Sequence, residues 1–272
     1  MHTNIFEPFS TFLVFIVIAL IMQACCEVGY RIGQHVRTRQ DKEAPISLGP
    51  MVGGLLGMLA FVLAFLFSMA ADQYNVRKQN VLDEADAIGT AYLRTDLLPS
   101  HQAELKTWLR EYVDVRLDAV TNAHNLESAI AHSIEIHALL WSRVSSAAIA
   151  QPDTNTALMV QSINDLIDMH EKRITAGLHS RIPDSIWLAL IIICILTMTT
   201  MGIQMGFSGK RRLVAMIPLS LAFAVLVTLV VDLDRPQKGL ITIGQQSMMD
   251  LQQEMRHGDE KATPDHTEPA AH

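Results

Sequence analysis

One stretch between residues 48 and 98 limits what this chain can fold into more than any other. Its first half, from Leu48 to Ala71, holds no ionisable side chain over about 24 residues, and a helix needs roughly 20 apolar residues to cross a bilayer. The second half turns polar, yet no proline interrupts it between Pro50 and Pro99. We therefore predict one helix that crosses the membrane and continues beyond it, with a length of about 75 Å at 1.5 Å per residue.

Small residues recur along the membrane half of this helix at a spacing of three or four, so they share one side. Two of them form the Gly-x-x-x-Gly pattern that lets helix backbones approach closely in lipid. The pattern favours packing of this side against a neighbouring helix. The predicted packing residues are Gly53, Gly57, Ala60 and Ala64.

A second interpretation concerns the adjacent side of the same helix, where two aromatic residues lie one turn apart. A pore wall with an apolar constriction can gate by dewetting, and it needs no charge within the membrane. The predicted pore-lining residues are Gly54, Met58, Phe61, Phe65, Ser68 and Asp72. Asp72 would lie at one mouth, where a ring of carboxylates in an oligomer favours cations.

Three further apolar runs explain why half of the 272 residues are hydrophobic and the mean hydropathy is +0.24. They are Phe9–Ala24, Ile186–Ile203 and Leu213–Val231. Together with the central stretch they predict four transmembrane helices. No Asp, Glu, Lys, Arg or His lies in the middle of any of the four, which disfavours an ion-coupled carrier.

The region between the second and third spans has helical periodicity throughout and no strand pattern. Four amphipathic helices joined by short turns predict a bundle. The predicted fold is thus an all-α membrane protein with four transmembrane helices and an extramembrane helical bundle inserted between the second and third spans. The predicted divisions are 1–71 (two spans and a basic loop), 72–184 (bundle), 185–231 (two spans), 232–256 (membrane-surface segment) and 257–272 (disordered tail). A short helix is expected from Ser247 to Met255, with Met249 and Leu251 pointing inward.

Charge gives a first indication of orientation. The segment after the first span and the loop between the third and fourth spans are basic, which places both in the cytoplasm and the bundle in the periplasm. The basic residues are Arg31, Arg37, Arg39 and Lys42 in the first segment and Lys210, Arg211 and Arg212 in the second. Basic residues also flank the spans on the other side, so the orientation stays open.

Several classes of function find no support in the sequence. A net charge of −7 without a basic face argues against nucleic acid as a partner. The three cysteines are small apolar residues of the spans and give no disulfide framework. No nucleotide-binding, hydrolase or zinc motif is present, so we expect no catalytic residue, no metal site and no cofactor.

The densest acidic group lies just beyond the membrane half of the central helix and contains Asp83, Glu84 and Asp86. Asp83 and Asp86 can share a helix face, where they would hold a cation or repel each other. A solvated or salt-bridged face is the other interpretation, and Glu84 with Arg94 would then fix helix packing.

Two stretches, DEADAIGTAYLRTDLLP (Asp83–Pro99) and DLDRPQKGLITI (Asp232–Ile243), resemble the signatures of the bacterial bestrophin-like domain family. The preceding GGLLGMLAFVLAFLFSMA (Gly53–Ala70) is similar to its glycine-rich membrane helix, and the resemblance covers roughly Leu48 to Met255. The residues that match these motifs are Glu84, Arg94, Asp232, Asp234, Arg235 and Pro236, whereas Asp86 stands where the family pattern has Asn.

The resemblance implies kinship with bestrophins, which are pentameric anion channels whose second membrane helix lines the pore. It implies a homo-oligomer in a lipid bilayer, the bacterial inner membrane, with the helical domain in the cytoplasm. This orientation opposes the one that the loop charges favour, and its anion preference opposes that of an Asp72 ring. The leading hypothesis is an oligomeric channel for small ions, not an enzyme. The alternative is a non-conducting membrane sensor or scaffold that signals through its helical bundle.

Overall fold

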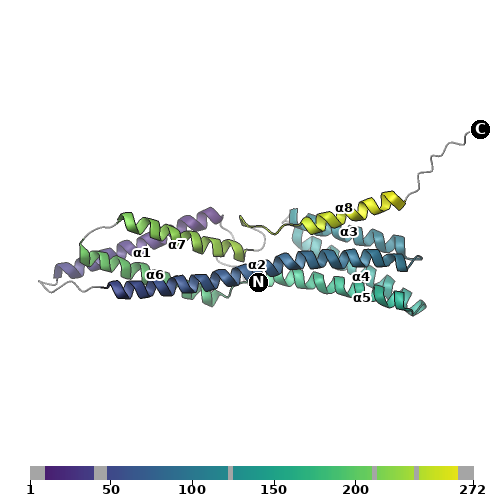
Figure 1. The fold of residues 1–272 in the computed structure, drawn as a ribbon, viewed down its shortest axis with the longest axis horizontal. Coiled ribbons are helices and arrows are strands. Elements are labelled where there is room, and N and C mark those ends of the chain that lie inside the picture. The colour runs from purple at the N-terminus through teal and green to yellow at the C-terminus, as the bar shows by residue number, and fades with distance from the viewer. Residues whose placement is uncertain (1–9, 40–47, 122–124, 210–212, 236–238, 263–272) are drawn as a thin grey trace, which may run out of the picture. The chain divides into compact units, whose positions relative to one another are not determined.

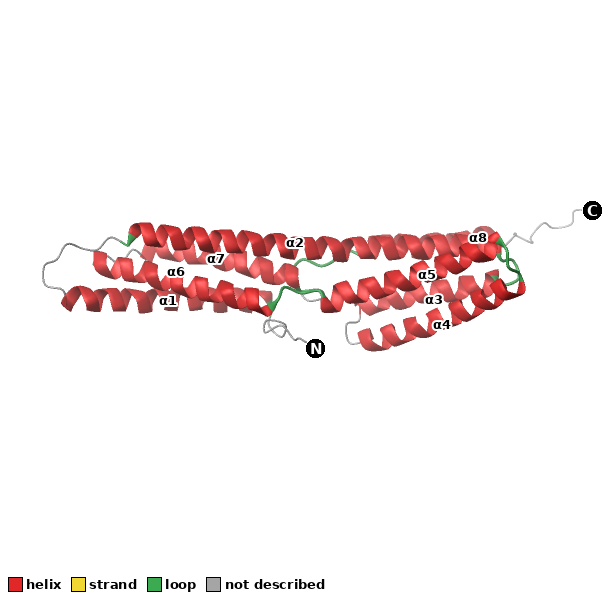
Figure 2. Cartoon of the chain, turned by 90° about the horizontal axis from the view of Figure 1, so that it is seen from below, coloured by secondary structure: helices red, strands yellow, loops and turns green. Residues whose placement is uncertain are grey.

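A computed structural model describes residues 10–39, 48–121, 125–209, 213–235 and 239–262. Within these ranges the chain contains helices and loops and no strand, which confirms the predicted all-α class (Figure 2). The elements are α1 (Thr11–Arg39), α2 (Gly49–Arg94), the 3₁₀ turn η1 (Thr95–Leu97), α3 (Gln102–Thr121), α4 (Leu126–Ala150), α5 (Thr154–Ile174), the π-helical turn η3 (Thr175–His179), α6 (Asp184–Ser208), α7 (Leu213–Asp234) and α8 (Gln246–Ala262).

Four helices, α1, α2, α6 and α7, are long and apolar enough to cross a membrane by length and composition. This confirms the four predicted apolar helices. The predicted continuity of the central helix is also confirmed, because α2 runs without interruption through Asp72 for 46 residues. The described chain forms two compact units, of which the first contains residues up to Tyr74 and Ser180–Thr242, and the second contains Asn75–His179 and the residues from Ile243 onward.

In the first unit α1 lies against α6 (Figure 1). Glycines of both helices form the contact. A methyl group built on Gly29 would lie 2.1 Å from the Thr199 carbonyl oxygen, and one built on Gly202 would lie 2.2 Å from the Cys26 carbonyl oxygen. Gly33 and Gly206 make similar approaches. The two backbones therefore touch directly, as small residues allow in membrane helices.

The basic loop predicted directly after the first span is wrong, and the contact between α1 and α6 explains why. The segment from Cys26 was expected to leave the helix and form a basic loop, but α1 continues to Arg39. Gly29 and Gly33 would weaken an isolated helix, yet here they are the residues that α6 packs against. Arg31, Arg37 and Arg39 are consequently helical, while Lys42, Lys210, Arg211 and Arg212 lie outside the described residues.

The second unit surrounds a core to which α2 (from Asn75), α3, α4, α5 and α8 all contribute. Each helix presents an apolar stripe, and α5 begins with a capping box between Asp153 and Thr156. Not every large apolar residue of these helices lies on a stripe: Ile134, Trp141 and Leu158 are exposed, by 52%, 42% and 38%.

The last helix is longer than predicted and is rotated from the expected position. It extends from Gln246 to Ala262 and so enters the segment that was expected to be disordered, while residues 263–272 lie outside the described ranges. Met248 and Met255 are buried in the core of the second unit and Leu251 packs against it, whereas Met249 is 39% exposed. The two buried methionines lie about two helical turns apart, so they share one face of α8.

Candidate functional site

The membrane half of α2 has one buried side and one exposed side. Leu59, Leu63 and Leu66 are buried in the core of the first unit. On the other side Phe61 and Phe65 are 74% and 56% exposed. The remaining predicted pore-lining residues, Gly54, Met58, Ser68 and Asp72, are exposed as well.

The four predicted packing residues share this exposed side. A methyl group built on Gly53, Gly54 or Gly57 would meet no other atom within 4 Å in the described part of the chain, and Ala60 and Ala64 are exposed. The close glycine contact of the first unit is the one between α1 and α6, which sequence reasoning missed. The sequence did contain a pattern that indicates this contact, namely two further Gly-x-x-x-Gly pairs, Gly29 with Gly33 and Gly202 with Gly206.

Beyond the membrane half, α2 carries Glu84 into a polar cluster at the centre of the second unit. The Glu84 carboxylate is fully buried, and its Oε1 atom lies 3.1 Å from Nε of Arg116 on α3. Arg173, near the end of α5, donates a hydrogen bond to Oε2 and a second one, of 2.8 Å, to the side chain of Gln245. One carboxylate thus faces two guanidinium groups from two other helices.

Tyr112 connects this ion cluster to two histidines. Its hydroxyl group donates to Glu84 at 2.6 Å and lies 2.9 Å from Nδ1 of His170. Because the tyrosine proton is directed at Glu84, His170 donates its Nδ1 proton to the tyrosine oxygen, and its Nε2 is left as an acceptor. The ring of His137 meets the ring of His170 edge-on, with centroids 4.7 Å apart.

Burial decides the protonation of the cluster. It lowers the pKa of His137 to about 4 and that of His170 to about 3, with Arg116 adding to the shift. Both rings are therefore neutral at pH 7, and the 3.9 Å approach of His170 to Glu84 is not an ion pair. For Glu84 burial alone would raise the pKa, but Arg116 and Arg173 outweigh it and hold the pKa below its usual value. Burial and the Glu84 charge raise the pKa of Tyr112.

The groups of this cluster contact one another across four helices. It joins α2, α3, α4 and α5, and Glu84, Tyr112 and His170 have no exposed surface. The predicted role of Glu84 in helix packing agrees with this, but its partners are Arg116 and Arg173 instead of Arg94. A signal was available in the sequence, since Tyr112, Arg116, His137 and His170 occupy positions on the apolar stripes of their helices.

The other charged residues of the first family-like stretch lie outside the cluster around Glu84. Arg94 donates to the Leu158 carbonyl oxygen at 3.0 Å and to the Ser162 hydroxyl group at 2.7 Å, both on α5. Asp86 is exposed, and Asp83 accepts a hydrogen bond of 2.8 Å from Gln79 within α2. In the described residues no group of three or more His, Cys, Asp and Glu side chains is placed to hold a metal ion.

The second family-like stretch forms a compact corner at the end of α7. The buried Asp232 carboxylate accepts from the backbone N–H groups of Leu240 and Ile241 and from the Thr11 hydroxyl group, at 2.8–3.0 Å. The buried Asp234 accepts from the N–H of Ile182 at 3.0 Å. These bonds attach the chain before α6, the start of α1 and the segment after α7 to one helix end. Arg235 is buried beside them, and Pro236 lies outside the described residues.

Together these features define a class: an all-helical protein with four apolar helices, one of which continues into a second helical unit built around a buried ion cluster. The bestrophin-like domain model matches residues 11–248, and the chain therefore belongs to the bestrophin-like family. The crystal structure of a bacterial bestrophin homologue from Klebsiella pneumoniae, determined with a point mutation, has the same fold, with a TM-score of 0.66 at 13% sequence identity over 93% of this chain and 99% of that one. No curated protein matches the sequence.

Proposed function

We propose that this chain is an integral membrane channel, assembled from several copies, that passes small ions along the membrane half of α2. The observation that carries the proposal is the side of α2 that carries Gly54, Phe61 and Phe65, which is exposed in the single chain and holds no charge until Asp72. A side without neighbours among the described residues of its own chain has either lipid or other copies to meet. Small residues with two large rings one turn apart suit a wall with a narrow apolar constriction.

Family membership supports a channel over an enzyme, and so does the burial of Glu84, whose carboxylate is bound by Arg116, Tyr112 and Arg173. In this proposal the second unit is the extramembrane bundle between the second and third spans. Glu84 would fix the rotation of α2 about its own axis. Arg116 and Arg173 bind the carboxylate of this residue, and α2 is the helix that lines the pore in this proposal. The exposed Asp72 favours cations at the mouth, while kinship with bestrophins favours anions, so selectivity is an outcome of the test.

The experiment is flux through purified protein in liposomes. Phe61→Ala combined with Phe65→Ala should raise ion flux several-fold because the constriction widens, whereas Phe67→Ala, which alters an exposed residue outside the predicted pore face, should leave it unchanged. Substituting Asp72 with Asn should shift the preference between cations and anions. If neither the natural chain nor the double variant passes ions, the channel proposal is wrong. Microscopy of the oligomer would test whether the α2 helices surround its axis.

The alternative is a non-conducting sensor or scaffold. One observation favours it: α2 is continuous from the first unit into the second, where Glu84 and Arg94 bind it to α3 and α5. Such a protein needs an output partner. Crosslinking in intact cells that captures a specific partner through the second unit, together with absent flux, would support this alternative over the channel.

A further inference from the structure

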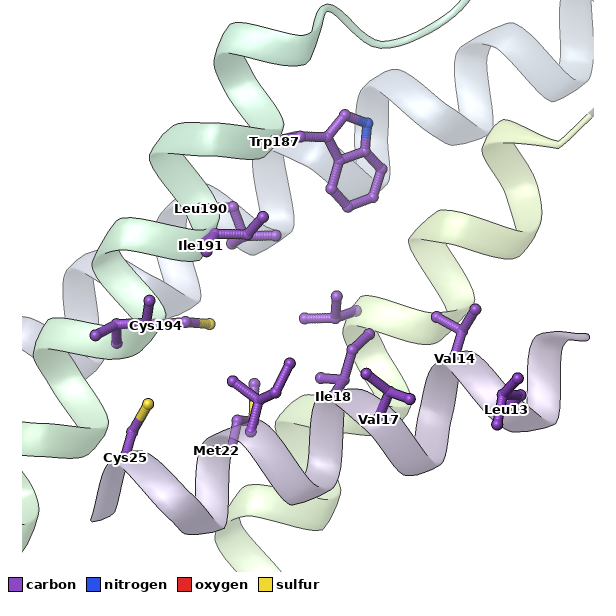
Figure 3. A pocket seen from close by; sticks show the side chains of 13 residues that line it. Leu13, Val14, Val17, Ile18, Met22, Cys25, Trp187, Leu190, Ile191 and Cys194 are labelled. Carbon is purple, nitrogen blue, oxygen red and sulfur yellow. The ribbon is translucent and has the colours of Figure 1, made fainter. Parts of the chain in front are cut away.

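A cavity of about 360 Å³ lies within the first unit between α1 and α6, with Val227 of α7 at its floor. Pockets of this size hold small ligands in other proteins, where a few polar groups orient them. This cavity is lined almost only by apolar atoms. Figure 3 shows side chains of both helices directed into the space, with Trp187 at one end and Cys25 and Cys194 at the other.

The floor and the rim of the cavity differ in exposure. Val14, Met22 and Leu190 are at most 3% exposed and form the floor. The rim residues Leu13, Val17, Ile21, Ile191 and Ile195 are 41–51% exposed. The cavity therefore opens sideways on the apolar surface of two helices that are long and apolar enough to cross a membrane, and it is continuous with the surface that hydrocarbon chains would cover.

The length of the cavity identifies the kind of molecule that fits. Its α1 wall extends from Leu13 to Cys25, which is about 18 Å at 1.5 Å per residue. One leaflet of a bilayer contributes about half of a hydrocarbon core of roughly 30 Å. A single acyl chain that extends through its leaflet would therefore fill the cavity from end to end. Trp187 lies in the first turn of α6, as expected for a tryptophan at the membrane interface, and it marks the end at which the polar headgroup would remain outside.

We propose that this cavity is a binding site for one acyl chain of a membrane phospholipid, with the headgroup beside Trp187 and the chain end near Cys25 and Cys194. Annular lipid packs against an outward surface on one side only, whereas a chain in this cavity is in van der Waals contact with protein on most sides. The site is independent of the proposed channel activity, because none of its lining residues belongs to α2.

The test uses the full chain in phosphatidylglycerol–phosphatidylethanolamine vesicles that contain increasing amounts of a phospholipid with a photoreactive diazirine in one acyl chain. Labelled peptides are mapped by mass spectrometry. We expect saturable labelling of α1 and α6 at the cavity and labelling of exposed α7 residues such as Leu221 and Val225 that rises in proportion to the probe. An excess of the same phospholipid without diazirine should compete with the cavity labelling.

Two matched variants sharpen the result. Ile18→Phe fills the middle of the cavity and should weaken saturable labelling roughly tenfold, since it takes the room of a few methylene groups and removes their packing contacts. Leu20→Phe adds the same ring on the exposed side of α1, outside the cavity, and should change nothing. Labelling of the cavity that rises in proportion to the probe, or that Ile18→Phe leaves intact, would overturn the proposal, as would crosslinks that show a second copy of the chain covering the cavity. Flux measured on the same vesicles separates this outcome from failure of the channel proposal.

Discussion

The two units hold their helices together by opposite means. In the first unit, α1 and α6 meet where side chains are missing, and glycines bring the backbones into contact. In the second unit, α2, α3 and α5 meet where side chains are largest and most polar, around Glu84. In lipid the hydrophobic effect does not drive helices together, so close packing has to do so. In water apolar burial supplies the attraction, and a buried ion cluster can then fix which helices meet.

The comparison predicts that different substitutions destabilise the two units. The largest loss of stability is expected from a substitution at Glu84 in the second unit. Glu84→Gln removes the charge that faces Arg116 and Arg173, and leaving buried charges without a counter-ion costs about 3–5 kcal/mol. We expect the free energy of unfolding of the second unit to fall by that amount. Thermal and denaturant unfolding in detergent, followed by Trp108 fluorescence in a chain whose other two tryptophans are replaced, would measure it.

Asp86→Asn is the matched control on the same helix, because it also removes one carboxylate but at an exposed position. Its effect should stay within about 0.5 kcal/mol. Equal effects of the two substitutions would mean that the cluster does not hold the second unit together.

The corresponding substitution in the first unit is Gly202→Val, which disrupts the contact between α1 and α6. Its Cβ atom would lie 2.2 Å from the Cys26 carbonyl oxygen, so α1 and α6 must separate, at a cost of about 1–3 kcal/mol or more for overpacking. Unfolding followed by Trp187, which is buried in this unit, would report the loss.

Gly57→Val is the control, since a Cβ atom built there would have no other atom within 4 Å in the described residues. Only the helix propensity should then change, by less than about 1 kcal/mol. If Gly57→Val instead dissociates an oligomer, the predicted packing role of Gly53 and Gly57 applies between copies.

The next largest difference between the two units should appear in acid, which should destabilise the second unit through two buried histidines. His137 and His170 have pKa values of about 4 and about 3 in the folded chain, below the value of about 6.5 of an unfolded histidine. The unfolded chain therefore binds more protons below about pH 6.5, and stability that is complete above this pH is lost as the pH falls. At about pH 5 the loss is up to about 2 kcal/mol for each histidine.

The loss should appear in the unfolding of the second unit measured from about pH 7.5 to about pH 5. His137→Phe keeps a ring in place and should remove about half of the pH dependence. His132→Gln should not reduce it, because His132 is exposed and the neighbouring Glu135 and Glu111 raise its pKa. A second unit that is indifferent to pH in this range would show that the histidines open to water without unfolding.

The sequence predicted the helices better than their contacts. Four uncharged runs and an uninterrupted stretch from Gly49 onward were enough for the spans and for α2, because length and composition are local properties. The partners of Glu84 could not be predicted in this way, since Arg116 and Arg173 are distant along the chain and many pairings satisfy one carboxylate. The Gly53–Gly57 pair drew attention because it lies in an uncharged run, yet spacing alone does not tell which helix face has a neighbour.

The smallest expected effect concerns Arg94, near the end of α2. It donates to the Leu158 carbonyl oxygen and to the Ser162 hydroxyl group, but it is only partly buried, so water can replace these bonds. We expect Arg94→Gln to lower the free energy of unfolding of the second unit by about 1 kcal/mol, the usual net value of a hydrogen bond. Arg143, whose ion pair with Glu104 is about 40% exposed on each side, gives the control: Arg143→Gln should cost less than about 1 kcal/mol. An Arg94 effect as large as that of Glu84→Gln would mean that the end of α2, rather than the buried cluster, determines how this helix is held.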